Sequence, residues 1–221
     1  MTEISSEDIG EILAALSALA FAAFGLLDAT KVFRGGIARV GLGVLRSALT
    51  PFAPVLDAAA GKDRWWQIVS ANWINGVAKV TQKAATVALV KLGLHPGTAA
   101  SLAAATHVDA KVLQSAAESL AQGVELSEQQ MNVLGRMNAV LETLLDAAYE
   151  EAEQRFRSWS RLAAGVIAIG VSALINALMN LAPWPIALLV GVLAVPVAPV
   201  AKDLTSALSA AARAIKAGKI V

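Results

Sequence analysis

The chain contains 221 residues, of which 57% are hydrophobic and only 16% are charged. Soluble domains usually carry about 45–50% apolar residues, glycine included, and about 25% charged residues. A soluble protein of this composition would expose large apolar patches, so the composition predicts an integral membrane protein. The net charge of +1 excludes an overall field that recruits nucleic acid, and the lack of cysteine excludes disulfides and thiolate metal sites. With only two histidines, His95 and His107, we expect no metal site and no cofactor.

The first predicted element is a membrane-crossing helix within residues 1–30. An uncharged apolar run extends from Ile12 to Leu27, which is slightly short of the roughly 20 residues that cross a hydrocarbon core of about 30 Å. The residues before this run are acidic, whereas a secretory signal begins with basic residues. We therefore expect a retained anchor.

Residues 31–126 are predicted to form short cytoplasmic or membrane-surface helices, because glycine and proline interrupt them and no strand-like alternation is sustained. Tryptophan prefers the headgroup region of a bilayer. The predicted membrane-interface residues are Trp65, Trp66, Trp73, Trp159 and Trp184. For the first three of these, core packing in a cytoplasmic bundle is an equally good interpretation. Basic side chains that could bind lipid headgroups, or act only in setting the topology, are Lys31, Arg34, Arg39 and Arg46.

A single long helix is predicted for residues 127–182. Ser127 and Gln130 have the spacing of a capping box. Apolar residues then recur every three or four positions and lead into an uncharged run from Leu162 to Ala182. At 1.5 Å per residue, this helix would be about 80 Å long, and its second half would be the second membrane-crossing helix.

Residues 183–201 are predicted to form a turn and a third membrane-crossing helix, the returning arm of a hairpin. The apolar run from Ile186 to Ala201 is short and has two prolines near its end, so complete crossing is left open. Residues 202–221 form a tail that is amphipathic between Asp203 and Lys216, a pattern typical of a helix at the membrane surface.

Charged residues flank the apolar runs asymmetrically. The charged residues that precede the first run are all acidic. Lysine and arginine follow the first run, precede the second run and follow the third. Basic residues near the ends of spans stay on the cytoplasmic side. We therefore predict a multi-pass protein of the cell (inner) membrane, with its N-terminus outside and its C-terminus cytoplasmic.

Small and polar residues form stripes at four-residue spacing in two of the apolar runs. Small residues let helices approach closely, and polar ones form hydrogen bonds between helices. The stripes therefore predict packing within the chain, contact between copies of the chain, or the lining of a pore. The residues are Ala164, Ala168, Ser172, Asn176 and Asn180 in the second run, and Ala14, Ala18 and Ala22 in the first.

Together these features predict an all-α integral membrane protein with three transmembrane helices, an N-terminal anchor and a C-terminal helical hairpin, and a helical cytoplasmic insert. The function predicted first is a non-enzymatic scaffold or accessory subunit of a larger assembly. Its expected partners are membrane lipid and other membrane proteins or copies of itself, with no nucleic acid and no identified small-molecule substrate. The alternative is a pore or channel lined by the polar face of the second run.

Overall fold

The computed structural model describes residues 6–32 and 35–196, and these residues form helices with no β-strand among them. The all-α prediction is therefore confirmed for this part of the chain. The chain divides into two compact units. We call residues 38–156 the central unit, and residues 6–37 together with 157–196 the terminal unit. The amphipathic tail predicted for residues 202–221 lies outside the described residues.

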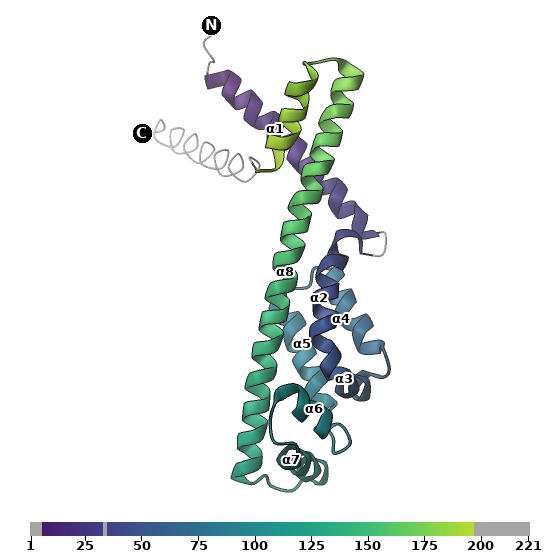
Figure 1. Cartoon of the computed structure of the whole chain (residues 1–221), viewed down its shortest axis with the longest axis vertical. Helices are drawn as coiled ribbons and strands as arrows, with labels where there is room; N and C mark the ends of the chain where they lie inside the picture. The colour runs from purple at the N-terminus through teal and green to yellow at the C-terminus, as the bar shows by residue number, and fades with distance from the viewer. Residues whose placement is uncertain (1–5, 33–34, 197–221) are drawn as a thin grey trace, which may run out of the picture. The chain divides into compact units, whose positions relative to one another are not determined.

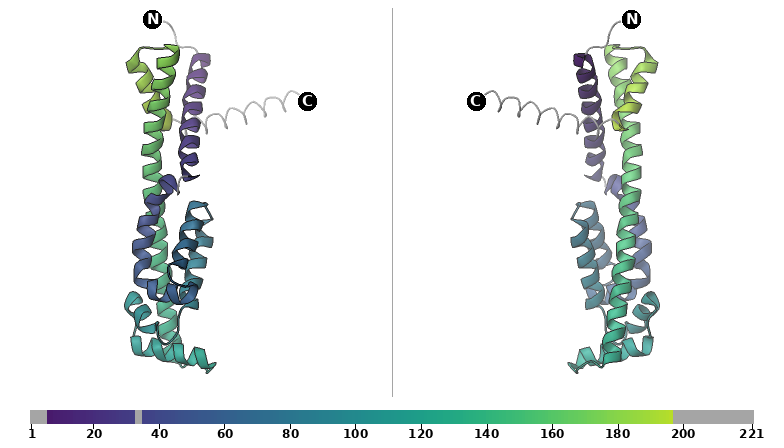
Figure 2. Two further views of the ribbon diagram at one scale, coloured as in Figure 1. Left: turned by 90° about the vertical axis from the view of Figure 1, so that its right-hand side faces the viewer. Right: turned by 90° about the vertical axis from the view of Figure 1, so that its left-hand side faces the viewer.

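The central unit is a bundle of short helices alongside the first half of a long one (Figures 1 and 2). Glycines with positive φ follow two of the helices, Gly61 after α3 and Gly123 after α7. Glycine is the usual residue there because it adopts the left-handed conformation without strain. The helices are α2 (Arg39–Leu49), η3 (Thr50–Phe52), α3 (Ala53–Ala60), α4 (Arg64–Ile74), α5 (Lys79–Leu92), α6 (Ala99–Thr106), α7 (Ala110–Gln122) and the part of α8 that ends at Phe156.

The core of the central unit is built against one face of α8. This face buries Leu141, Leu145, Ala148 and Ala152, which follow one another at three- and four-residue spacing. Leucine, valine and phenylalanine side chains from α2, η3, α3 and α5 pack in the same cluster. A contiguous apolar core of this kind is what holds a helical domain together.

The capping box predicted at the start of α8 is present. The backbone N–H of Ser127 donates to Gln130 Oε1 at 2.8 Å, and the N–H of Gln130 donates to Ser127 Oγ at 3.3 Å. These two bonds satisfy backbone donors that the first turn of a helix leaves free. From there α8 runs without interruption over Glu128–Met179, so one helix covers most of the range predicted for it.

The terminal unit contains two long apolar helices and a shorter one (Figure 2). It consists of α1 (Ser6–Ala29), η1 (Thr30–Val32), the second half of α8 and a helix that covers Trp184–Pro196; η2 (Gly36–Ala38) leads into the central unit. Both α1 and α8 are long and apolar enough to cross a membrane. Part of the third predicted run, residues 197–201, lies outside the described residues.

Candidate functional site: the helical hairpin of the terminal unit

The hairpin consists of the second half of α8, a short turn and the 184–196 helix. Helix α8 ends at Met179 because the next residue, Asn180, adopts a left-handed conformation with φ of 49°. Asparagine tolerates this conformation better than most residues. The N–H of Asn180 donates to Asn176 O at 2.8 Å. The helix therefore ends before Pro183, where the sequence had placed its end, and Asn180 is a capping residue outside the stripe.

Small residues bring the two arms of the hairpin into close contact. Ala164 and Ala168 on α8 and Ala194 on the second arm are fully buried. Gly191, on the second arm, lies against the backbone of α8: a Cβ added there would be 2.6 Å from the Cα of Ile169 and 3.1 Å from the carbonyl oxygen of Ala168. Because the neighbouring atoms are backbone atoms, only glycine fits at this position.

Two polar side chains close the hairpin at its turn. Ser172 Oγ donates to the carbonyl oxygen of Ala187 at 2.6 Å, and the N–H of Ala182 donates to Asn176 Oδ1 at 2.9 Å. Both side chains are buried, with Ser172 8% exposed and Asn176 5% exposed. A buried polar group is costly without a partner, so these bonds favour this particular register of the two arms.

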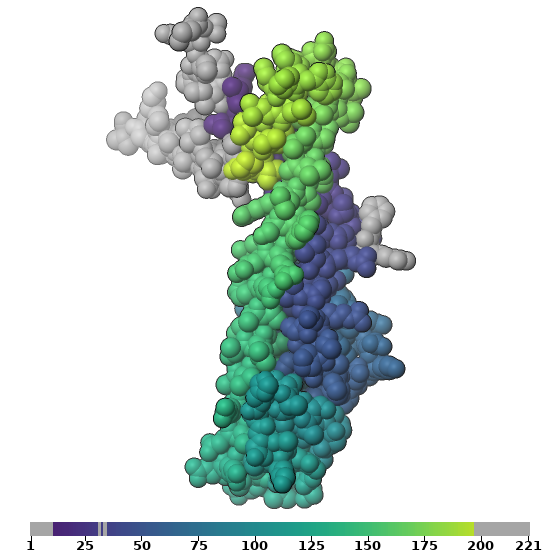
Figure 3. All heavy atoms as spheres, in the orientation of Figure 1, coloured from purple at the N-terminus to yellow at the C-terminus, as the bar shows by residue number. Residues whose placement is uncertain are grey.

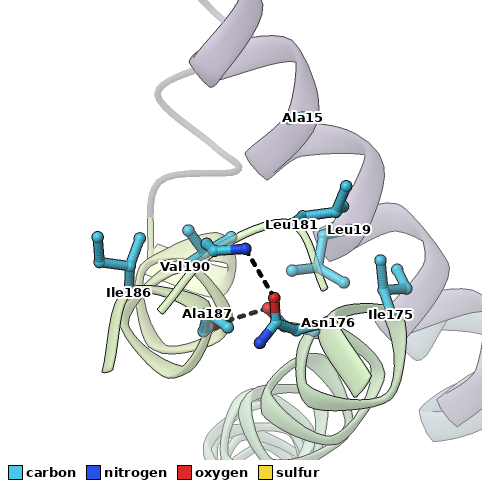
Figure 4. Close-up of a pocket in the computed structure, with 10 residues that line it drawn as sticks. Ala15, Leu19, Ile175, Asn176, Leu181, Ile186, Ala187 and Val190 are labelled. Atoms are coloured by element: carbon cyan, nitrogen blue, oxygen red, sulfur yellow. Dashed lines mark hydrogen bonds between the residues drawn. The ribbon is translucent and has the colours of Figure 1, made fainter. Parts of the chain in front are cut away.

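A cavity of about 250 Å³ lies beside the turn, between α1 and the hairpin (Figure 4). Apart from Ser172 and Asn176, its lining side chains are aliphatic, and none of them is ionisable. Figure 4 shows a hydrogen bond on the oxygen of Asn176 and none on its nitrogen. The ten lining residues are Ala15, Leu19, Ser172, Ile175, Asn176, Leu181, Ala182, Ile186, Ala187 and Val190.

Comparisons with known proteins give no match. No protein-family model matches the chain, no curated protein matches it, and no solved structure does.

The structure separates the two predicted stripes. Ala164, Ala168, Ser172 and Asn176 are buried in the hairpin, whereas the stripe on α1 is exposed and consists of Ala14, Ala18 and Ala22. The packing face of α1 is instead Leu16, Leu19, Ala20, Ala23 and Leu27. The packing expected within the chain for the α1 stripe is therefore not found, because α1 has alanines on more than one face and buries the face that also carries leucines.

The predicted tryptophans divide between the two units. Trp65 Nε1 donates to Asp57 Oδ1 at 2.8 Å, and Trp73 Nε1 donates to the carbonyl oxygen of Ala38 at 2.8 Å. Trp65 is buried in the core of the central unit, and Trp66 and Trp73 are partly buried against it. The structure thus places these three in bundle packing. In the terminal unit, Trp159 and Trp184 are exposed.

Of the four residues predicted to bind lipid headgroups, only Arg39 and Arg46 have side chains within the described part of the chain. Arg39 and Arg46 are exposed on α2, and the guanidinium carbon of Arg46 lies 5.5 Å from the centre of the Trp66 ring. This distance is within the range of a cation–π contact. Arg34 and the side chain of Lys31 lie outside the described part of the chain.

The central unit contains a buried polar pair that the sequence did not indicate. Thr86 Oγ1 and Tyr149 Oη are 3.0 Å apart, and Thr86 Oγ1 also donates to the carbonyl oxygen of Gln82. Burial raises the pKa of the Tyr149 phenol, and the bond to Thr86 partly opposes this. At the surface, the hydrogen bond from Lys79 to Glu150 is the main cause of a raised Lys79 pKa.

The two histidines and Asp109 lie at turns of the central unit. His95 Nδ1 accepts a hydrogen bond from the N–H of Gly97 at 3.1 Å, and His107 ends α6 with φ of 53°. The carboxylate of Asp109 caps α7 by accepting from the N–H of Val112 at 2.9 Å. These residues therefore act in local turn and capping structure.

Sequence reasoning missed the partner face of the hairpin. Ala187, Gly191 and Ala194 supply the small surface that meets α8, with four- and three-residue spacing between them. This spacing is the signal that could have identified them, since small residues on one face favour close helix approach in membranes.

Proposed function

We propose that the terminal unit is embedded in a lipid bilayer and that the chain is a non-enzymatic scaffold or accessory subunit of a larger membrane assembly. The observation that carries the membrane part is the apolar surface of the terminal unit. Phe21, Val166 and Leu178 are 61%, 71% and 77% exposed, and most of the exposed large apolar side chains in the described residues belong to this unit. Figure 3 shows the surface of the hairpin in light green to yellow.

The interior of the terminal unit supports the same proposal. Its buried residues are mainly alanines, whereas its leucines, isoleucines and valines lie largely on the outside. Transferring one such large side chain from water to an apolar medium is favourable by about 1.5–3 kcal/mol. Small residues inside and large apolar residues outside are the pattern of helices that pack in lipid, where apolar burial between helices is not the driving force.

The proposed topology places both junctions between the units on one side. The part of α1 that is apolar enough to cross a membrane is Glu11–Ala29, and its 19 residues have a length of about 28 Å, close to a hydrocarbon core of about 30 Å. With the N-terminus outside, α1 leads inward to residue 38, and α8 leads outward from residue 156. The central unit then lies in the cytoplasm as one body, and the turn around Trp184 lies outside.

The central unit supports the scaffold part of the proposal. Around its α7–α8 loop it exposes three apolar side chains, Leu120, Val124 and Met131. Exposed apolar side chains at neighbouring positions along the chain are candidates for a protein contact. The pore alternative is less well supported, because Ser172 and Asn176 already bond to backbone within the hairpin and are largely buried.

Membrane insertion and topology can be tested together on the full chain. We expect the protein to remain in the membrane pellet after alkaline carbonate extraction. Because the chain lacks cysteine, single-cysteine variants can report topology without background labelling. A membrane-impermeant maleimide should label Trp184→Cys in intact cells and Glu125→Cys only after permeabilisation. Extraction by carbonate would refute membrane insertion, and the reverse labelling pattern would refute the topology.

The assembly can be tested by native electrophoresis of membranes solubilised in mild detergent. We expect a complex clearly larger than the 22.8 kDa chain. The double variant Val124→Asp, Met131→Asp should release the chain from this complex, whereas the control Val80→Asp, at an exposed position on α5, should not. A monomer in native membranes would contradict the scaffold proposal.

A further inference from the structure

Asn176 is a largely buried residue whose amide nitrogen has no hydrogen-bond acceptor among the described residues. Asn176 Oδ1 accepts from the N–H of Ala182, which fixes the orientation of the amide, because a flipped amide would place two donors opposite each other. Nδ2 therefore lies on the other side. It donates to none of the described residues, although Asn176 is only 5% exposed, and its neighbours do not seal it.

This donor belongs to the lining of an otherwise aliphatic cavity. Leu19 from α1 and Ile175 from α8 lie on one side of Asn176, and Ile186 and Val190 from the second arm lie on the other (Figure 4). A ligand that complements this lining has an aliphatic chain and a hydrogen-bond acceptor close to it. A charged group would not suit the cavity, because no ionisable side chain lines it.

The depth of Asn176 narrows the choice of ligand, and this step depends on the membrane placement proposed above. Asn176 lies three residues before the last residue of α8, or about 4.5 Å along the helix axis. The exposed Trp184, the first residue of the second arm, suits the headgroup level. The headgroup and interfacial layers are about 5–8 Å thick on each side of the bilayer. Asn176 therefore lies near the boundary where the ester carbonyls of glycerolipids are found.

We propose that this cavity binds the part of a membrane glycerolipid's acyl chain nearest the ester, with Asn176 Nδ2 donating a hydrogen bond to the ester carbonyl. The cavity volume of about 250 Å³ exceeds the roughly 150 Å³ that accommodates benzene in an apolar protein core. The bound lipid would fill the space between α1 and the turn and satisfy the remaining donor of Asn176.

Native mass spectrometry of the full chain in mild detergent can test this proposal. The probes are a phosphatidylethanolamine with two ester-linked chains and its ether-linked analogue, which has the same headgroup and chains but no carbonyls. The ester lipid can accept one hydrogen bond from Asn176 that the ether lipid lacks. A hydrogen bond as strong as those measured between membrane helices, or slightly stronger, predicts that the ester lipid is retained about three- to fivefold more tightly than the ether lipid. Equal retention of the two lipids would overturn the proposal.

A substitution that fills the cavity is a second test of the lipid proposal. It leaves Asn176 in place, because removing Asn176 would also break the hydrogen bond that closes the turn. Ala15→Phe should fill the cavity and lower retention of the ester lipid at least threefold. The matched control Ala22→Phe, on an exposed position of the same helix that does not line the cavity, should retain it as the unaltered chain does. Equal retention by the two variants would also overturn the proposal. Both variants should resist carbonate extraction, and a loss of that resistance in the unaltered chain would instead indicate that the membrane placement is wrong.

Discussion

Replacing Gly191 with alanine should separate the two arms of the hairpin. The added Cβ would be 2.6 Å from the Cα of Ile169, and ordinary contacts begin at 3.4 Å, so the arms must move apart by about 0.8 Å. Overpacking of this kind costs about 1–3 kcal/mol. The same movement lengthens the 2.6 Å bond from Ser172 to Ala187 to about 3.4 Å, beyond the usual O–H···O distance of about 2.5–3.0 Å, and losing this bond adds about 0.6 kcal/mol.

The matched control is Gly170→Ala, because a Cβ there meets nothing within 4 Å. Both substitutions gain the same helix propensity, so the gain cancels between them. We expect Gly191→Ala to be about 1.6–3.6 kcal/mol less stable than Gly170→Ala. Titration of the full chain with SDS in mixed micelles, followed by circular dichroism, measures the difference. Equal midpoints for the two variants would refute the close contact between the arms.

Two further predictions concern the central unit and can be measured by urea unfolding of the full chain, followed by tryptophan fluorescence. Gly93→Ala should destabilise the bundle by about 1–3 kcal/mol, because the added Cβ would lie 1.9 Å from the carbonyl oxygen of Val55. The control Gly43→Ala should leave the stability unchanged, because a Cβ there meets nothing within 4 Å. Similar unfolding midpoints for the two variants would contradict this prediction. Tyr149→Phe should cost about 0.5–1.5 kcal/mol at pH 7, because it removes the bond to Thr86. Since burial raises the folded-state pKa of Tyr149 above the ordinary value of 10.0, the neutral phenol stabilises the fold below pH 10, and this contribution is lost as the pH rises through the folded-state pKa. The difference between the two proteins should therefore shrink above pH 10, and a constant difference would show that the phenol is not desolvated.

The sequence allowed the helices to be predicted better than their contacts. The long helix, its capping box and the buried stripe through Ala168 and Ser172 follow from local spacing, which a single sequence displays directly. The packing face of α1 does not. Alanines lie on several faces of this helix, so spacing alone cannot select Ala20 and Ala23 over Ala18 and Ala22.

The polar contacts were beyond sequence reasoning for a related reason. Trp65 and Trp73 donate to partners on other helical segments, and these pairs form only when the bundle brings the segments together. The four-residue spacing includes Asn180 in the stripe, yet its left-handed backbone places it after the helix. Spacing reports which residues share a helix face, but it does not report where the helix ends.

In the bilayer placement proposed above, the turn of the hairpin bears on how the chain would be inserted during synthesis. Residues 183–185 carry no charge, and three backbone N–H groups around them, those of Asn180, Ala182 and Ile186, already have acceptors within the hairpin. Moving an unsatisfied backbone group or a charge through hydrocarbon costs several kcal/mol. A turn with its own acceptors avoids much of that cost, so we expect both arms to enter the bilayer together, as a preformed pair, with the turn leading the way across.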